Sequence, residues 1–187
     1  MPNYEELYND AKNKYNQAVS EKSSIRTKSG QLQTQKVELE RQLSQKRTAL
    51  SNIQKKQAAV DAVITKVNKI QSEQFPAMKK GLKNASEAYA DVLSADSGVA
   101  NLLNIYDTDI TATNNNLNQI HTEMTRILNA LNAEEKTAKN EVKKYNDDLN
   151  NVKKQINGLG SEAAAQIKID FYYTEMKTYE VKWLNGE

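Results

Sequence analysis

The sequence predicts an all-α, elongated antiparallel helical hairpin, coiled-coil-like, with an interrupted return arm and a C-terminal helix. Three observations carry this prediction. The 187 residues include only two prolines and six glycines, so few turns are available. Hydrophobic residues make up 38% of the chain and the mean hydropathy is −0.80, which argues against a thick globular core. Apolar side chains recur in alternating steps of four and three, as in a helix that buries a narrow seam against another helix.

The first helix is expected over residues 4–74. Stepping by four and three from Tyr4 to Gln71 visits twenty positions, of which fourteen are apolar, without a change of phase. Gly30 is the one weak point, because glycine costs about 1 kcal/mol relative to alanine inside a helix. The helix is expected to end at Phe75-Pro76, since the residue before a proline avoids the helical conformation.

A shorter helix is expected over residues 76–95, as the first part of the return arm. Its apolar residues continue the same stepping: Met78, Leu82, Ala85, Tyr89 and Val92. The sequence Ala95-Asp96-Ser97-Gly98 is a turn signal, and residues 99–108 form an apolar knot that interrupts the return arm.

The third helix is expected over residues 109–157, capped by Asp109 or Thr111. Thirteen positions stepped from Leu117 to Leu159 include eleven apolar residues. The return arm therefore packs on the first helix and leaves its polar faces in water. On this path Lys22 falls opposite Glu135, and opposed charges in a seam fix the register. If the hairpin opened, the same seam would make a dimer of long helices.

We divide the chain into a hairpin over residues 1–160 and an amphipathic aromatic helix over 161–187. Gly158-Leu159-Gly160 breaks the return arm, Ser161 can start a new helix, and Asn185-Gly186 can cap it. One face of this helix is apolar: Ala165, Ile169, Tyr172, Met176, Tyr179 and Trp183. Two interpretations stay open, and both can hold. The face folds back onto Tyr4, Tyr8 and Tyr15, or it docks on a partner.

The residues that several kinds of catalytic, metal-binding and phosphate-binding site require are missing from the sequence. The chain has no cysteine and one histidine, His121, so neither a histidine triad nor a histidine-pair zinc site can form. No glycine-rich phosphate loop occurs. We predict a non-enzyme without a cofactor or a bound metal. No apolar run approaches the roughly 20 residues that span a bilayer, and MPNYEELYND lacks the pattern of a signal peptide.

The charge is unevenly distributed. Residues 1–70 hold 13 basic and 7 acidic side chains, and residues 71–187 hold 13 and 17. A basic arm can bind phosphates, but a basic helix lying along an acidic one inside a single chain is the simpler explanation, and we favour it. The basic residues occur singly on several faces, and no aromatic residue lies between Tyr15 and Phe75. We therefore expect no nucleic-acid partner.

The layout resembles the small helical proteins that accompany LXG toxins in Gram-positive type VII secretion, most closely the YwqH-like family of the WXG-like superfamily. The similarity covers roughly residues 15–160. It rests on KSGQLQTQKVELERQLSQKRTALSNIQ, FPAMKKGLKNASEAYADVL, NNNLNQIHTEMTRILNALNAE and the ending KKQINGLG. The resemblance implies an accessory or targeting chaperone that binds the helical N-terminal region of an LXG toxin and promotes its export. A second small helical accessory protein is a further partner to consider.

The resemblance also implies an export signal in the last helix, an aromatic residue followed four positions later by an acid. Phe171 and Glu175 fit this pattern. The predicted partner-binding surface comprises Phe171, Tyr172, Glu175, Met176, Tyr179 and Trp183. We expect a cytoplasmic protein and leave open its export with its partner by a route independent of a signal peptide. The alternative function is a structural coiled-coil scaffold or spacer of a phage or a cell surface.

Overall fold

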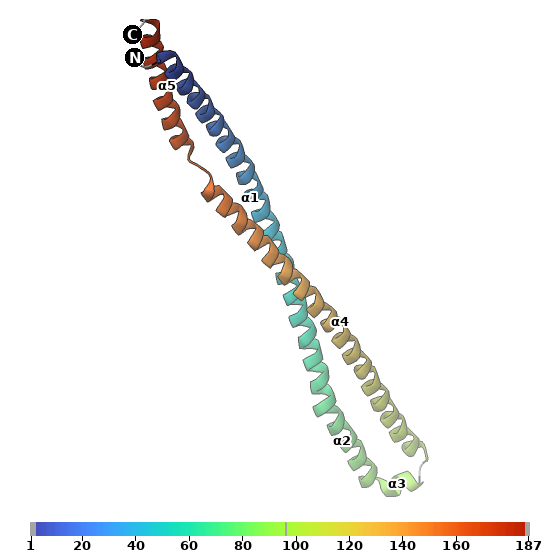
Figure 1. The fold of residues 1–187 in the computed structure, drawn as a ribbon. Coiled ribbons are helices and arrows are strands. Elements are labelled where there is room, and N and C mark those ends of the chain that lie inside the picture. The colour runs from blue at the N-terminus through green and yellow to red at the C-terminus, as the bar shows by residue number, and fades with distance from the viewer. Residues whose placement is uncertain (1–2, 96, 186–187) are drawn as a thin grey trace. The chain divides into compact units, whose positions relative to one another are not determined.

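A computed structural model describes residues 3–95 and 97–185 and is 97% helical, with no strand in these residues (Figure 1). The predicted all-α class and the helical hairpin are confirmed. The elements follow one another along the chain as α1 Tyr4–Lys69, the π-helix η1 Ile70–Gln74, α2 Phe75–Ala88, α3 Ala90–Ala95, α4 Ser97–Gly158 and α5 Glu162–Leu184.

The chain forms two compact units. Unit 1 comprises Met1–Gln45 with Val142–Glu187, and unit 2 comprises Lys46–Glu141. In unit 1 the first part of α1 runs antiparallel to the end of α4 and to α5 (Figure 1). In unit 2 the rest of α1, η1 and α2 form one arm, α3 makes the turn, and α4 returns alongside (Figure 1). The last helix therefore belongs to the same packed unit as the start of α1.

Burial follows the predicted seam closely. All twenty positions stepped from Tyr4 to Gln71 are buried or half-buried, and the other residues of that span are exposed except Gln42 and Ile70. All thirteen positions stepped from Leu117 to Leu159 are likewise buried or half-buried. Most of these side chains keep some contact with water, because two helices can cover only one stripe of each other. The core is a thin line of apolar contacts between the arms.

Side-chain pairs across the seam report the register. Glu21 pairs with Lys168, Gln57 donates to Asn132, and Gln71 donates to Asn118. In each pair, the two residue numbers add up to about 189. Both units thus share one antiparallel register.

The predicted helix end at Phe75-Pro76 is wrong. The chain stays helical there, and Phe75 has φ −65° and ψ −45°. Instead of a break, the chain makes the wide turn η1, in which the Phe75 N–H donates to the carbonyl of Ile70, five residues earlier. Proline has no N–H to donate, so a turn that widens just before it satisfies the backbone without ending the helix.

The spacing of apolar residues gives a second reason for η1. Val67, Gln71 and Phe75 follow one another in two steps of four, one residue more than the four-three rhythm allows. The wide turn absorbs this extra residue and brings Phe75 into the seam, where it is 7% exposed. Met78, which the uninterrupted rhythm would have buried, is 51% exposed.

The turn of the hairpin lies later in the chain than predicted: α2 continues the first arm, α3 makes the turn, and the return arm begins with α4 rather than at Pro76 (Figure 1). Residues 99–108 are part of α4, so the expected knot is helix, and Asp109 and Thr111 lie inside the helix rather than at its start. After Gly98 this segment holds no proline or glycine, and its leucines favour helix, so nothing in it forces an interruption. The return arm is instead interrupted after Gly158, between α4 and α5, whereas Tyr89 separates α2 of the first arm from α3 of the turn. Asp96 of the predicted turn lies outside the described residues.

The start of the last helix is as predicted. The Ser161 hydroxyl accepts hydrogen bonds from the backbone N–H groups of Ala163 at 3.2 Å and Ala164 at 3.4 Å, which makes Ser161 the N-cap of α5. At the other end Asn185 caps the helix, and its N–H donates to the carbonyl of Val181 at 3.1 Å. Gly186 lies outside the described residues.

Candidate partner-binding surfaces

The inner face of α5 packs on the start of α1. Ala165 of this face is buried, and Tyr172, Met176 and Tyr179 are half-buried. The rings of Trp183 and Tyr8 lie 5.7 Å apart. A second ring pair, Tyr173 with Tyr15, lies at 6.0 Å, and the Lys182 ammonium lies 5.3 Å from the Tyr4 ring.

These contacts match the interpretation in which the tail folds back onto the tyrosines of the first helix. Of the six residues predicted to bind a partner, Tyr172, Met176 and Tyr179 are therefore largely occupied within the chain. Trp183 is shared between the two roles, since its ring meets Tyr8 yet 42% of the residue is exposed.

The other two predicted residues, Phe171 and Glu175, differ in how far their side chains are exposed to solvent. Phe171 is 57% exposed and lies edge-on to the Tyr172 ring, with ring centres 5.3 Å apart. Glu175 is half-buried. Asp10, which accepts a hydrogen bond from Lys14, raises the pKa of that lysine, and the Glu175 carboxylate adds to the rise. The ring is thus available to a partner, while the carboxylate also serves the contact with α1.

The predicted register pair between Lys22 and Glu135 does not form, because each side chain has other partners. Lys22 donates to Gln166 of α5 at 2.6 Å. Glu135 accepts hydrogen bonds from Gln54 and Gln57 and pairs with Lys139 at 2.8 Å. The prediction failed because it placed the turn at Phe75-Pro76 and counted residues 76–95 in the return arm. With α2 in the first arm and the turn at α3, the residue that faces each position lies about 30 positions later in the chain.

A polar layer surrounds Glu135 in unit 2. The hydrogen bonds from Lys139, Gln54 and Gln57 lower the pKa of Glu135 to about 2, which keeps the carboxylate charged at a seam position. A similar layer joins Gln71 to Asn118 at 2.7 Å and to Asn114 at 3.3 Å. Such layers hold the two arms in register, because sliding the arms would bury these groups against apolar neighbours.

The clearest apolar hollow lies in unit 2, where η1 and α2 face α4. It encloses about 510 Å³, and its lining is Ile70, Gln74, Phe75, Met78, Tyr106, Asp109, Ile110, Thr113 and Leu117. We name it the η1 groove. Phe75 is buried there, while Met78 and Tyr106 are 51% and 53% exposed. Asp109 is its single charged lining residue. The groove thus offers an apolar strip with one negative charge.

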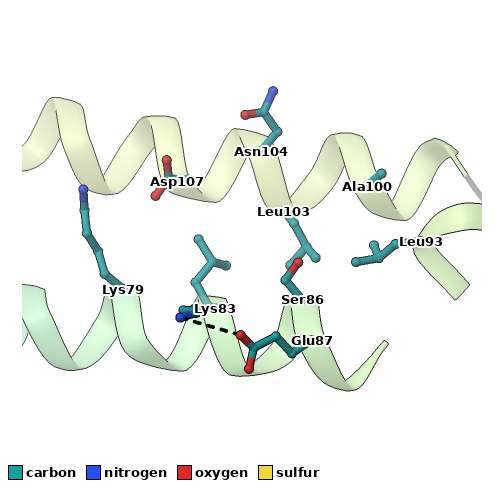
Figure 2. A pocket seen from close by; sticks show the side chains of 10 residues that line it. Lys79, Lys83, Ser86, Glu87, Leu93, Ala100, Leu103, Asn104 and Asp107 are labelled. Carbon is teal, nitrogen blue, oxygen red and sulfur yellow. Dashed lines mark ion pairs between the residues drawn. The ribbon is translucent and has the colours of Figure 1, made fainter. Parts of the chain in front are cut away.

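A second hollow, nearer the turn, is more polar. It also measures about 510 Å³, and α2, α3 and α4 contribute to it (Figure 2). Leu93 and Leu103 point into it, Lys79 extends from α2 toward α4, and Lys83 pairs with Glu87 at 3.7 Å (Figure 2). With charges of both signs around few apolar groups, this hollow is the weaker candidate for binding an apolar partner.

Sequence reasoning did not foresee the η1 groove. Its signal was present in the double step of four from Val67 through Gln71 to Phe75, followed by Pro76. That pattern marks a local change in helix winding, and π turns often lie at functional sites.

Within residues 3–95 and 97–185, no group of three or more His, Cys, Asp or Glu side chains is arranged to hold a metal ion. In that same part of the chain, no helix is both long and apolar enough to cross a membrane.

Comparison with protein-family models, curated proteins and solved structures found no match to this chain.

Proposed function

We propose that this chain is a non-enzymatic accessory or targeting chaperone that binds a helical segment of a protein partner. The single observation that carries the proposal is the η1 groove. Its exposed Met78 and Tyr106 form an apolar strip beside the buried Phe75. An apolar strip between two antiparallel helices suits the apolar face of a third helix.

The partner class comes from the resemblance described above. It is the helical N-terminal region of an LXG toxin, whose type VII export the accessory would promote. The resemblance is confined to sequence pattern, so the groove supplies the physical basis. Methionine and tyrosine are common in such contacts, because one adapts its shape and the other offers a large, rigid apolar ring.

Phe171 and Glu175 complete the proposal as the export signal. The exposed Phe171 ring can enter a receptor groove directly. Glu175, one turn further along α5, would offer its carboxylate beside the ring once the receptor has docked. This function places toxin binding in unit 2 and export in unit 1.

Co-purification with the N-terminal region of an LXG toxin tests the binding step. The variant Met78→Ser with Tyr106→Ser should weaken the complex about tenfold or more, because exposed apolar anchors dominate such interfaces. The matched control is Leu102→Ser with Ile105→Ser. These residues are 50% and 48% exposed on α4 but do not line the groove, and binding should be unchanged. Equal loss of binding in both variants would refute the groove as the site.

A structural scaffold or spacer is the second candidate function. It is favoured by the seam, which pairs α1 with α4 and α5 from Tyr4 to Gln71 without needing another protein. This function requires no partner in the η1 groove. If no LXG region binds and the groove variant behaves as the wild type in every assay, the scaffold is the better description.

A further inference from the structure

Helix α5 carries a second apolar stripe, on the side away from α1. We name it the outer stripe. Its members follow steps of three and four and are all exposed: Ala164, Ile167, Phe171, Thr174, Thr178 and Val181. Ile167, Phe171 and Val181 are 69%, 57% and 56% exposed. A helix that is apolar on two opposite sides is typical of one that is covered on both.

The two threonines belong to this stripe as apolar groups. The Thr174 hydroxyl donates to the carbonyl of Asp170, and the Thr178 hydroxyl donates to the carbonyl of Thr174, both at 2.8 Å. Because the helix backbone accepts these hydroxyl hydrogens, the methyl groups remain as the outward contact surface. The outer stripe is therefore continuous from Ala164 to Val181.

Charged residues flank the outer stripe in two rows. One row contains Asp170 and Lys177, and the other contains Lys168, Glu175 and Lys182. When two copies of a helix pair antiparallel, each row meets the same row of the other copy, and opposite charges must coincide for the pairing to be favourable. The order of positive and negative charges along each row therefore determines which pairing of the two helices is favourable.

One antiparallel register opposes unlike charges at four of the five flanking positions, and Lys182 then meets the uncharged Ser161. It places Phe171 against Thr174 of the second copy and Ile167 against Thr178. Asp170 then meets Lys177 and Lys168 meets Glu175, each twice because the arrangement has two-fold symmetry.

The alternative pairings bring like charges together. A shift of one heptad in one direction opposes Lys177 to Lys177 and Glu175 to Glu175. A shift in the other direction opposes Asp170 to Asp170 and Lys168 to Lys168. In a parallel pairing, Asp170 would face Glu175 and Lys177 would face Lys182. Among the pairings that bring most of the outer stripe together, the first register alone avoids repulsion.

We propose that the outer stripe is a self-association surface on which a second copy of this chain docks antiparallel. The contact lies wholly in unit 1, so it is independent of the η1 groove. Lys177 and Lys168 already pair with Glu180 and Glu21 at 2.6 and 3.1 Å. These pairs are exposed and worth little, so the lysines can turn toward the second copy. In the dimer Phe171 is covered, and an export receptor would compete with the second copy for it.

Sedimentation equilibrium tests the apolar contact. The wild type should show twice the 21.1 kDa mass of one chain at high concentration. The variant Ile167→Ser with Phe171→Ser should show the mass of one chain. Val37→Ser, which changes a 64% exposed side chain of α1 in the same unit, should leave the dimer intact. A wild type that stays at the mass of one chain would overturn the proposal and leave the stripe to a different protein.

A charge swap tests the register. Asp170→Lys alone should weaken dimerisation about tenfold, because it sets two lysines against each other at both ends of the contact. Asp170→Lys combined with Lys177→Asp should restore it to within about threefold, since opposite charges meet again. Circular dichroism must show unchanged helix content in both variants. A dimer that ignores these changes, or that the double swap fails to rescue, uses another surface and refutes the proposal.

Discussion

Replacing Phe75 by alanine tests whether η1 serves to bury that ring. Phe→Ala in a protein core costs about 3–5 kcal/mol of unfolding free energy. Two features place the expected loss at the low end, about 3 kcal/mol. The alanine recovers roughly 0.5 kcal/mol of helix propensity, and a two-helix layer can close partly over the gap. Met78→Ala is the matched control, and at 51% exposure it should cost only about 1 kcal/mol.

Urea unfolding followed by circular dichroism measures both losses. Hydrogen exchange in unit 2 then shows whether the loss is local to η1 and α2. The expected difference of about 2 kcal/mol corresponds to roughly a 30-fold change in the unfolding equilibrium constant. Equal effects of the two substitutions, or faster exchange around Met78 than around Phe75, would contradict the view that the wide turn brings Phe75 into the seam.

Three further predictions concern single positions. Gly30→Ala should raise the unfolding free energy by about 1 kcal/mol, because Gly30 lies inside α1 with open space around it, and an unchanged urea midpoint would contradict this. The Glu135 pKa, lowered from 4.5 to about 2, means that its ionised form stabilises the fold above pH 4.5 and that this contribution is lost as the pH falls toward 2. The stability difference between wild type and Glu135→Gln should therefore be constant above pH 4.5 and shrink below it, and a difference that persists at pH 2 would rule out titration of Glu135 as its source. Trp183→Ala should cost about 1 kcal/mol through the lost ring contact with Tyr8 and speed hydrogen exchange only near the ends of α1 and α5, whereas uniform acceleration would argue against a local role.

The periodic apolar residues were sufficient to predict the seam, because burial in a two-helix contact depends on spacing alone. They were insufficient to predict the register. Glu135 and Lys22 are both seam positions, and nothing in their spacing says which residue each faces. That depends on where the turn of the hairpin lies, which is a property of the whole chain.

For the candidate sites, too, some features could be predicted from the sequence and others could not. The inner face of α5 was identified from its sequence as a contact surface, and the contact with Tyr8 and Tyr15 was one of two interpretations. The η1 groove was not identified, because it arises from a change in helix winding. A proline was taken as the end of a helix, whereas the backbone needed only one wider turn before Pro76.

The common register has a consequence for how this chain can change in length. A residue added to one arm of a helical pair shifts every later side chain by about 100°, so it must be matched in the other arm or absorbed locally. Segment Ile70–Gln74 already contains such an absorbed residue. Loss of one residue there would return the first arm to ordinary winding, while the same loss in mid-helix would turn the seam toward solvent. Natural insertions and deletions should therefore concentrate near η1, at Tyr89 and at the Leu159–Gly160 link, where the chain already departs from regular winding.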